Sequence, residues 1–326
     1  MSTIQLGTSK LTVSRIAYGC MPLGGSWDDA PVTDDIRTRA FTALDTAYEA
    51  GMRFFDHADI YCRGKSETVF GQWMKERKID RKGIHIQTKC GIQPGSAAMP
   101  TRFNFSREWI FSSVDGSLAR LGTDYLDVLL LHRPDVLAEP DEIAEAFMRL
   151  KQTGKVRNFG VSNHSAAQIE LLTTKVPIPF VANQIELSLL HTAPLDDGVN
   201  WNISGNAHLT GGGWTVEYCR KHEITIQPWS PLAKGLLGGR EIRQDDPRAA
   251  HIESTAQIVR SMAADKGVQP ETILIAWLLK HPAKFQPVIG TRDPDRIRAC
   301  VAAIDTPISR DEWYTLYQAG RGSKLP

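Results

Sequence analysis

Residues 106–132 read SREWIFSSVDGSLARLGTDYLDVLLLH, and this stretch places a helix signal directly before a strand signal. Ser106 is a good helix N-cap and Gly122 is a typical helix terminator. Between them, aliphatic side chains recur on one helical face at Ile110, Val114 and Leu118. The aliphatic run 128–131 then predicts a buried strand, which stops at the polar residue His132.

The same alternation extends in both directions along the chain. Short β-branched or aliphatic runs predict eight strands, at residues 16–19, 53–55, 84–88, 128–131, 156–161, 180–184, 224–228 and 287–289. Segments of helical period lie between them. One begins at Ser165, where Gln168 completes a capping-box pattern, and it is expected to bury Ile169 and Leu172.

Eight strands that alternate with helices imply parallel strands joined by right-handed crossovers. A closed barrel and an open doubly wound sheet both satisfy this pattern. The open sheet normally carries a G-x-G-x-x-G fingerprint after its first strand, and residues 19–25 lack that spacing. We therefore expect an α/β protein with a (β/α)8 TIM barrel, formed by residues 1–326 as a single domain without an interdomain linker.

Two segments exceed the minimal barrel. Residues 1–12 predict a short hairpin that turns at Gly7-Thr8-Ser9 and plugs the barrel floor. Residues 185–213 predict a long irregular loop after the sixth strand, rich in Gly, Asn and Asp. Because the base of this loop lies on the rim beyond the strand ends, and because it carries Trp201, we expect it to form part of a substrate pocket.

The bulk composition excludes several classes of function. The chain has 38 Lys and Arg residues against 37 Asp and Glu residues, which indicates neither a nucleic-acid face nor an anionic membrane surface. No membrane span or signal peptide is expected, and five scattered cysteines favour a reducing compartment, so we expect a cytoplasmic protein. His191 and His208, with Asp196 and Asp197, match no metal-ligand spacing, so no metal is expected.

Four titratable residues follow the predicted strands on what would be one rim. Asp56 and Tyr61 follow the second strand, Lys89 follows the third and His132 follows the fourth. Any one of them alone is more often a cap or a surface group than a catalytic residue, but together they would share one pocket. An ammonium beside Tyr61 would stabilise its phenolate, and a carboxylate would hold that ammonium in place. Such a site protonates an oxygen, and a reduction would also need a hydride-carrying cofactor.

With these residues in place, the chain resembles the aldo-keto reductase family over nearly its whole length. The family's tetrad order Asp, Tyr, Lys, His occurs at positions 56, 61, 89 and 132, with the family's spacing between Asp and Tyr. Further matching segments are Tyr125-Leu-Asp127 before Leu-Leu-His132, Gly154-Lys-Val-Arg157 before Gly160-Val-Ser-Asn163, and Ser230-Pro231-Leu232. The resemblance implies reduction of a small-molecule carbonyl substrate with NADP(H), the cofactor binding first, and Tyr61 as the proton donor.

The resemblance also implies a cofactor site. Ser162, Asn163 and Gln184 would hold the nicotinamide carboxamide, and Trp229 would stack on the ring where the family more often has Tyr. The pyrophosphate and the adenosine 2′-phosphate would lie along two further segments that contribute Ser230, Leu232, Lys234, Gly290, Arg292 and Arg296. Many members carry Glu-Asn a few residues later to hold the adenine. This chain has Ala299-Cys300 there, which shifts the expected cofactor binding onto the two arginines.

Other residues and functions were weighed beside these. His57 and Asp59 are expected to be structural, and Cys90 has no argued base that would make it a nucleophile. Trp27 and Trp201 are the expected substrate-pocket residues. One alternative function is a Schiff-base aldolase, which would need a neutral lysine. Another is a regulatory subunit that senses nicotinamide cofactors and gates a membrane partner.

Overall fold

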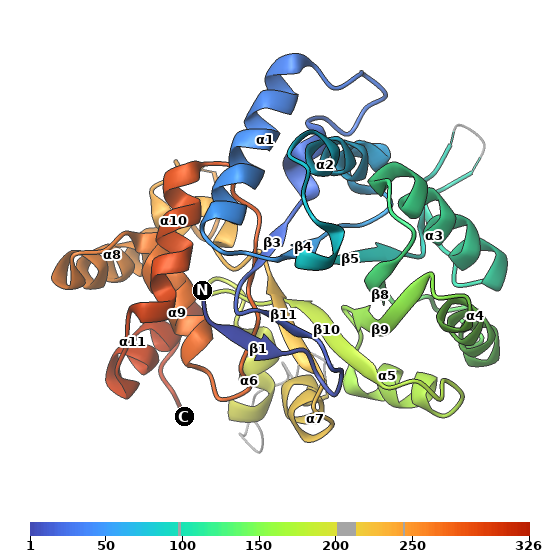
Figure 1. Ribbon diagram of the computed structural model, residues 1–326. Coiled ribbons are helices and arrows are strands. Elements are labelled where there is room, and N and C mark those ends of the chain that lie inside the picture. Colours follow the sequence, from blue (N-terminus) through green and yellow to red (C-terminus); the bar gives the residue numbers. More distant parts are fainter. Residues whose placement is uncertain (97–98, 201–212, 244) are drawn as a thin grey trace.

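The computed structural model describes residues 1–96, 99–200, 213–243 and 245–326, and these ranges include a closed barrel of eight parallel strands (Figure 1). The barrel strands, in order around the ring, are β3 (Ala17–Gly19), β4 (Phe54–Asp56), β5 (His85–Cys90), β8 (Leu126–Leu131), β9 (Val156–Ser162), β10 (Phe180–Glu186), β11 (Thr225–Trp229) and β12 (Val288–Ile289). Each predicted strand is present, with ends that differ by one or two residues. The (β/α)8 prediction is confirmed.

Helices surround the barrel and connect its strands (Figure 1). Their bounds are α1 (Asp34–Glu49), α2 (Lys65–Glu76), α3 (Arg107–Leu121), α4 (Pro140–Gln152), α5 (Ala166–Thr173), α6 (Ala193–Val199), α7 (Thr215–Lys221), α8 (Ala249–Lys266), α9 (Pro270–Lys280), α10 (Pro294–Ala302) and α11 (Arg310–Arg321). The local signals act as expected: Ser106 caps α3 by accepting from the amide of Trp109, Gly122 ends it at φ +65°, and Ser165 and Gln168 form the capping box of α5.

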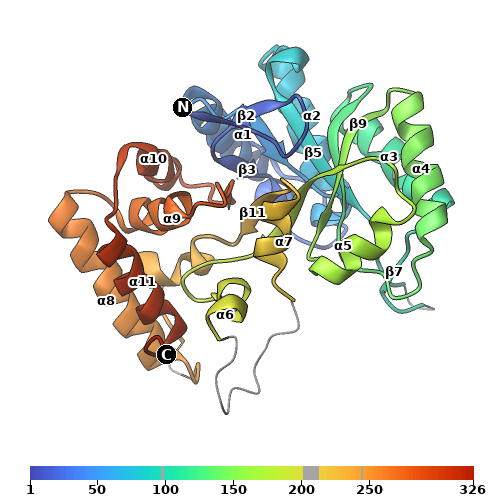
Figure 2. The same ribbon diagram turned by 90° about the horizontal axis from the view of Figure 1, so that it is seen from below.

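The N-terminal hairpin closes the floor of the barrel. β1 (Thr3–Gln5) pairs antiparallel with β2 (Thr12–Ser14), as predicted. Gly7 lies in the turn at φ +53°, and a Cβ atom there would lie 2.4 Å from the carbonyl oxygen of Val181, so the close approach requires glycine. Leu6 and Val13 pack with apolar side chains inside the barrel, such as Phe54. Figure 2 shows the hairpin at one end of the barrel and α6 at the other.

The connection after β10 departs from the predicted irregular loop because residues 193–199 form the helix α6. Proline in its first turn and the carboxylate of Asp196 both favour a helix start there. The C-terminal helix α11 then anchors it: Tyr317 Oη donates to Asp196 Oδ1 at 2.5 Å, and Arg321 Nη2 donates to Asn200 Oδ1 at 2.8 Å. Residues 201–212, with Trp201 and His208, lie outside the described residues.

Two additions to the minimal barrel were not predicted. A second hairpin, β6 (Ile92–Gln93) with β7 (Arg102–Phe103), follows β5 at the end of the barrel opposite the floor. The helices α8 and α11 pack on each other outside the barrel, where Thr255 Oγ1 donates to the carbonyl of Ala319 at 3.0 Å.

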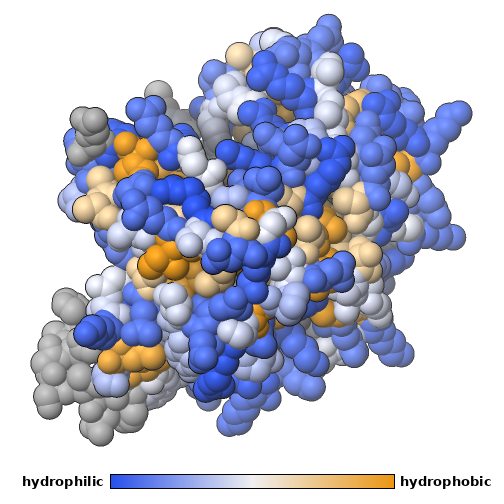
Figure 3. All heavy atoms as spheres, turned by 90° about the vertical axis from the view of Figure 1, so that its left-hand side faces the viewer, coloured by the Kyte–Doolittle hydropathy of each residue, from blue (hydrophilic) through white to orange (hydrophobic). Residues whose placement is uncertain are grey.

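The face that carries α8, α10 and α11 is largely hydrophilic, with scattered apolar side chains (Figure 3). Among the described helices, none is long and apolar enough to cross a bilayer.

Candidate active site

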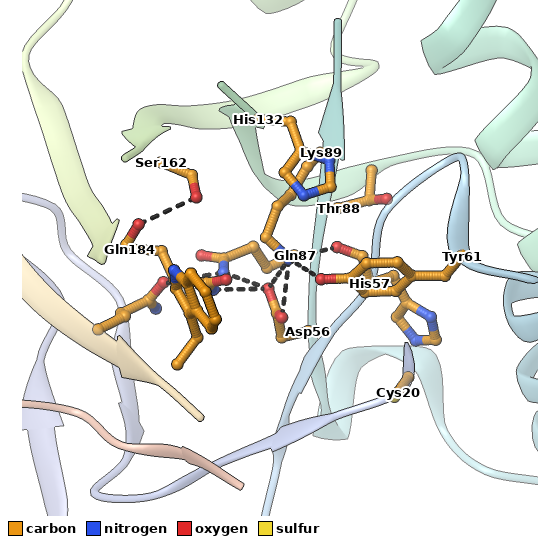
Figure 4. Close-up of polar contacts among 12 residues, drawn as sticks. Cys20, Asp56, His57, Tyr61, Gln87, Thr88, Lys89, His132, Ser162 and Gln184 are labelled. Atoms are coloured by element: carbon orange, nitrogen blue, oxygen red, sulfur yellow. Dashed lines mark hydrogen bonds and ion pairs between the residues drawn. The ribbon is translucent and has the colours of Figure 1, made fainter. Parts of the chain in front are cut away.

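The carboxyl ends of three adjacent strands bring the predicted tetrad together. Asp56 ends β4, Lys89 lies near the end of β5, and His132 follows β8 directly. Tyr61 begins the short 3-10 turn Tyr61–Gly64 after β4. Neighbouring strands are in parallel register, with Asp56 opposite Gln87 and Lys89 opposite Leu130. The four side chains converge at one place (Figure 4).

Lys89 is the centre of this cluster. Its fully buried ammonium donates to both carboxylate oxygens of Asp56 at 2.9 and 2.8 Å, to the carbonyl of His57 at 2.8 Å and to the hydroxyl of Tyr61 at 2.9 Å. Burial lowers the pKa of Lys89, but the charge of Asp56 and the contact with Tyr61 raise it by more than burial lowers it. The net shift of the pKa is therefore upward. Lys89 is therefore a protonated ammonium at neutral pH.

Tyr61 holds its proton in this environment. Enclosure of its hydroxyl raises the pKa of Tyr61, and the charge of Lys89 opposes that shift without reversing it. Because Oη accepts a hydrogen bond from Lys89, the phenolic proton of Tyr61 remains available to another acceptor. The ring meets the imidazole of His132 edge-on, with centroids 5.9 Å apart. The phenol is thus positioned beside both a cation and a second hydrogen-bonding side chain.

His132 is a neutral imidazole. Burial lowers its pKa well below 6.5, and the nearby positive charges of Lys89 and Arg133 lower it further. Its Nδ1 is buried without a hydrogen-bond partner among the described residues. The backbone is fixed on both sides, because its amide donates to the carbonyl of Cys90 at 2.9 Å and its carbonyl accepts from Asn163 Nδ2 at 3.1 Å. A neutral imidazole held in this way can donate one hydrogen bond to a carbonyl oxygen.

The residues expected to hold a nicotinamide form one connected network. Asn163 donates from Nδ2 to Ser162 Oγ at 2.9 Å, and Ser162 Oγ donates to the carbonyl of Gln184 at 2.9 Å. The indole Nε1 of Trp229 donates to Asn163 Oδ1 at 3.0 Å. The amide of Gln184 donates to Asp56 Oδ1 at 2.9 Å, so this network joins the tetrad directly.

A cavity of about 600 Å³ joins these groups. Predicted site residues that line it are Trp27, Asp56, Tyr61, His132, Ser162, Asn163, Gln184, Trp229, Ser230, Leu232, Lys234, Gly290 and Arg296. Lys89 is fully buried behind Asp56 and Tyr61 and does not line the cavity. Arg292 is also absent from the lining, and it lies nearby with Nη1 donating to the carbonyl of Pro22 at 3.5 Å. The volume is typical of a small-molecule site.

The end of the cavity near α10 carries more charge than the sequence indicated. Arg296 Nε lies 3.2 Å from Oε1 of Glu271, a nearly buried carboxylate that also lines the cavity. Lys234 is exposed beside them in a left-handed conformation, with φ +57°. Ala299 and Cys300 are buried and do not line the cavity, and the carbonyl of Ala299 accepts from Thr272 Oγ1 at 2.8 Å. The two residues that depart from the family pattern therefore face the protein interior.

A row of buried glutamines lies beneath the tetrad and was not predicted from the sequence. Gln87 Nε2 donates to Asp56 Oδ1 at 2.6 Å and to Gln227 Oε1 at 2.9 Å, and Gln227 Nε2 donates to Gln286 Oε1 at 2.8 Å. These amides fix the position of the Asp56 carboxylate. One signal was present, because Gln87 precedes Lys89 by two residues in a strand and so faces the same side.

His57 and Asp59 lie outside the cavity lining, although both flank the tetrad in sequence. Burial, together with the charge of Lys89, lowers the pKa of His57 to about 3, and its ring packs against Phe70 with centroids 4.6 Å apart. Burial raises the pKa of Asp59 to about 7, and the charge of Glu67 adds to that shift. The backbone carbonyl of His57 nevertheless contributes to the site because it accepts from Lys89.

The chain is similar to known proteins in sequence and in fold. The model of the Aldo/keto reductase family matches residues 15–320. The oxidoreductase YcsN of Bacillus subtilis (strain 168) is 33% identical over 331 residues, which cover 100% of both chains. The 6-dehydroglucose reductase of Agrobacterium fabrum is 32% identical over 98% of both chains. The solved structure of the glycerol dehydrogenase AKR11B4 from Gluconobacter oxydans has a TM-score of 0.80 at 22% identity, covering 97% of this chain and 94% of that chain, and it shows a shared fold.

Proposed function

Because the chain belongs to the aldo/keto reductase family of oxidoreductases, we propose that it reduces an aldehyde or ketone to an alcohol with NADP(H), and that Tyr61 is the proton donor. One observation carries this proposal. The ammonium of Lys89, paired with Asp56, lies 2.9 Å from the hydroxyl of Tyr61. That contact stabilises the phenolate as the proton leaves, which a phenol otherwise resists at neutral pH.

The cavity fits a nicotinamide dinucleotide. It has an indole wall at Trp229, an amide-rich pocket around Asn163 and Gln184, and cationic side chains at Lys234 and Arg296. A flat ring can stack on the indole, a carboxamide can pair with the amides, and phosphates can bind the cations. When bound, the cofactor supplies the hydride.

The protein's own residues donate the proton and stabilise the charge that develops on the carbonyl oxygen. Tyr61 donates its proton to the carbonyl oxygen, and His132 donates a hydrogen bond to the same oxygen and orients it. Lys89 stabilises the resulting phenolate, and Asp56 keeps Lys89 in place. The buried glutamines hold Asp56 in turn, so Asp56 and Gln87 are positioning residues. Reprotonation of Tyr61 completes the cycle.

NADP(H) rather than NAD(H) is proposed because four cationic side chains, those of Lys234, Arg240, Arg292 and Arg296, lie in or beside one end of the cavity. A 2′-phosphate gains charge-assisted hydrogen bonds from such groups, which the bare ribose cannot. The carboxylate of Glu271 works against this preference because it is already paired with Arg296. The preference therefore depends most on the cations that have no described carboxylate partner, which are Lys234, Arg240 and Arg292.

Trp27 is proposed as the substrate-pocket residue at the other end. Its half-exposed indole meets the ring of Tyr61 edge-on at 6.4 Å, and it lines the cavity together with Ile60 and Ile92. These side chains make an apolar wall beside the proton donor. Trp201 stays a sequence-based proposal, since it lies outside the described residues.

The aldolase alternative is disfavoured by the state of Lys89. A Schiff base needs a neutral amine as nucleophile. Here four oxygen atoms accept from the ammonium and the pKa of Lys89 is raised, so the amine is protonated. The regulatory-subunit alternative makes a different prediction, because such a subunit binds the cofactor without steady-state turnover.

We also propose that residues 1–326 form one domain in a reducing, cytoplasmic compartment. The barrel strands span residues 17–289, and the C-terminal helix α11 packs back on α8. All five cysteines are buried and free, as expected of a protein that does not depend on disulfides.

A panel of aldehydes and ketones tests the proposed function. Oxidation of NADPH is followed by its absorbance, beside parallel reactions with NADH. Turnover of a carbonyl compound by the wild type and its loss in Tyr61→Phe support the proposal. Tight NADPH binding without turnover of any carbonyl in the panel contradicts it and favours the regulatory subunit.

A further inference from the structure

Arg133 is a cation at the reacting end of the cavity with no described counter-ion. It follows His132 directly, its side chain is exposed, and it lines the same cavity as Tyr61. Within the described part of the chain, its guanidinium forms no ion pair and lies over the indole of Trp229, 5.7 Å from the ring centroid. An arginine stacked in this way presents its N–H groups at the edge, where a ligand can reach them.

The carboxylate that is closest to Arg133 in sequence, that of Asp135, is hydrogen-bonded to backbone amides. Asp135 Oδ2 accepts from the amide of Phe105 at 3.0 Å, and Oδ1 accepts from the amide of Leu137 at 3.0 Å. These bonds shape the loop after β8 and commit both oxygens of Asp135 to backbone donors. The fold therefore places an acidic residue two positions away without neutralising the guanidinium.

The backbone before Arg133 and the ring that its guanidinium contacts are held by hydrogen bonds. Asn163 donates to the carbonyl of His132 at 3.1 Å and accepts from the indole of Trp229 at 3.0 Å. The backbone before Arg133 and the ring beneath its guanidinium are thus tied through one amide. A cation that is preorganised in this way loses less conformational entropy on binding a ligand.

The remaining charges at this end of the cavity cancel. Asp56 is paired with Lys89, so the pair carries no net charge. The surrounding walls are apolar, with Met21, Trp27 and Ile92 among the lining residues. Arg133 therefore leaves one uncompensated positive charge at the exposed rim of the cavity that the proposed proton donor also lines. An anionic substituent on the substrate would neutralise it.

We propose that Arg133 selects carbonyl substrates that carry a carboxylate, an inference that rests on the reductase function proposed above. The guanidinium binds the carboxylate through charge-assisted, bidentate hydrogen bonds, and the apolar walls contact the body of the substrate. The substrate class is an aldehyde acid or keto acid with an apolar body. The neutral ester of the same compound lacks the charge and is the weaker substrate.

The test compares 4-carboxybenzaldehyde with methyl 4-formylbenzoate at saturating NADPH. The wild type is expected to favour the acid in kcat/KM. Arg133→Met lowers kcat/KM for the acid by roughly 10- to 100-fold, the loss of a charge-assisted pair, mainly through KM. The value for the ester stays within about twofold of the wild type.

Arg133→Lys keeps the positive charge but not the planar, bidentate guanidinium, so it retains part of the preference for the acid. Arg149→Met, at an exposed position of α4, is the matched control and behaves as the wild type.

A second measurement does not depend on turnover. Benzoate is titrated into the NADPH-saturated protein by calorimetry. It binds the wild type and Arg149→Met, and it binds Arg133→Met at least tenfold more weakly. A separate titration of NADPH into the cofactor-free variant gives its NADPH affinity, and an unchanged value shows that the variant remains folded.

Several results overturn the inference. Equal losses for the acid and the ester in Arg133→Met, or a wild type without preference for the acid, remove the selective role. A weakened NADPH affinity in Arg133→Met assigns the guanidinium to the cofactor. These outcomes leave carbonyl reduction intact and so differ from failure of the proposed function, in which the wild type reduces neither compound nor any other carbonyl.

Discussion

Glu271 and Arg296 form an ion pair with 3.2 Å between Oε1 and Nε, at the end of the cavity where the sequence predicts an adenosine 2′-phosphate. Glu271 lies near the start of α9 and Arg296 near the start of α10, and the two helices pack on each other. A 2′-phosphate that binds Arg296 must compete with this carboxylate. In the proposed complex, this carboxylate therefore weakens the preference for NADPH over NADH.

We expect the wild type to bind NADPH more tightly than NADH, and Glu271→Gln to widen that difference because the competing charge is removed. Arg292→Ala and Arg296→Ala should each reduce the difference in binding free energy between NADPH and NADH. The reduction is at most roughly 1.5–3 kcal/mol, the value of a charge-assisted hydrogen bond. Calorimetric titration with both cofactors measures the effect. Glu145→Gln, at an exposed residue of α4 that pairs with Arg107, is the control. Equal affinity of the wild type for the two cofactors would contradict the assignment.

Tyr61→Phe should abolish carbonyl reduction while leaving NADPH binding nearly unchanged. The substitution removes the proposed proton donor and keeps the ring that packs against His132 and Trp27. The loss of a general acid costs on the order of a hundredfold or more in kcat. Steady-state kinetics and NADPH titration are compared for the two proteins. Wild-type turnover in Tyr61→Phe would mean that another group donates the proton.

Lys89→Met should destabilise the fold because it leaves the carboxylate of Asp56 buried without its cation. Breaking one side of a buried ion pair costs about 3–5 kcal/mol. Adding Asp56→Asn to Lys89→Met should restore part of the loss, since a neutral amide needs no counter-ion. Urea unfolding of the wild type, the two single variants and the double variant gives the coupling energy. Strictly additive losses would show that the two side chains do not stabilise each other.

The contribution of Asp59 to stability should fall as the pH rises from about 4 to about 7, whereas His57, whose pKa is lowered to about 3, contributes in the opposite direction over that range. Burial raises the pKa of Asp59 from 3.8 to about 7, and its Oδ1 has no hydrogen-bond partner among the described residues. Between about pH 4 and pH 7 the unfolded chain has released this proton while the folded chain retains it. The contribution of Asp59 to the free energy of unfolding therefore decreases over that window, by up to roughly 4 kcal/mol.

Asp59→Asn isolates this contribution because it removes the titrating group and keeps its shape. Urea unfolding from pH 4.5 to pH 8 should show the variant gaining stability relative to the wild type as the pH rises. Asp115→Asn, at an exposed residue that pairs with Lys155, should show no such trend. A pH-independent difference between wild type and Asp59→Asn would rule out the raised pKa.

Trp27→Ala should raise KM for aromatic aldehydes by roughly tenfold, which corresponds to about 1.4 kcal/mol of lost contact. Trp27 lines the cavity, and Arg63 Nε donates to its backbone carbonyl at 2.9 Å. A small aliphatic aldehyde that does not reach the indole should show little change, and NADPH affinity should hold. Leu171→Ala, at an exposed position of α5, serves as the control. An unchanged ranking across the panel would place selectivity elsewhere.

The barrel and the set of residues on its rim could be predicted from the amino-acid sequence. Ser106 and Gly122 end a helix through hydrogen bonds and backbone angles that involve a few neighbouring residues. The apolar runs stop at Asp56, Lys89 and His132, which are brought to one edge by any closed parallel barrel. These features are predictable because periodicity, caps and strand ends are local, and because parallel strands align their carboxyl ends.

Which side chains neutralise one another could be seen in the folded structure and not in the sequence. Glu271 and Arg296 meet because α9 packs on α10, and Arg133 lies over Trp229 because β8 and β11 end on the same rim. The helix α6 forms where the sequence indicated a loop, anchored on the C-terminal helix by Tyr317. Such contacts join residues that are distant in the chain, and their geometry depends on how the barrel closes. Charge compensation therefore follows from packing, and composition or local pattern does not determine it.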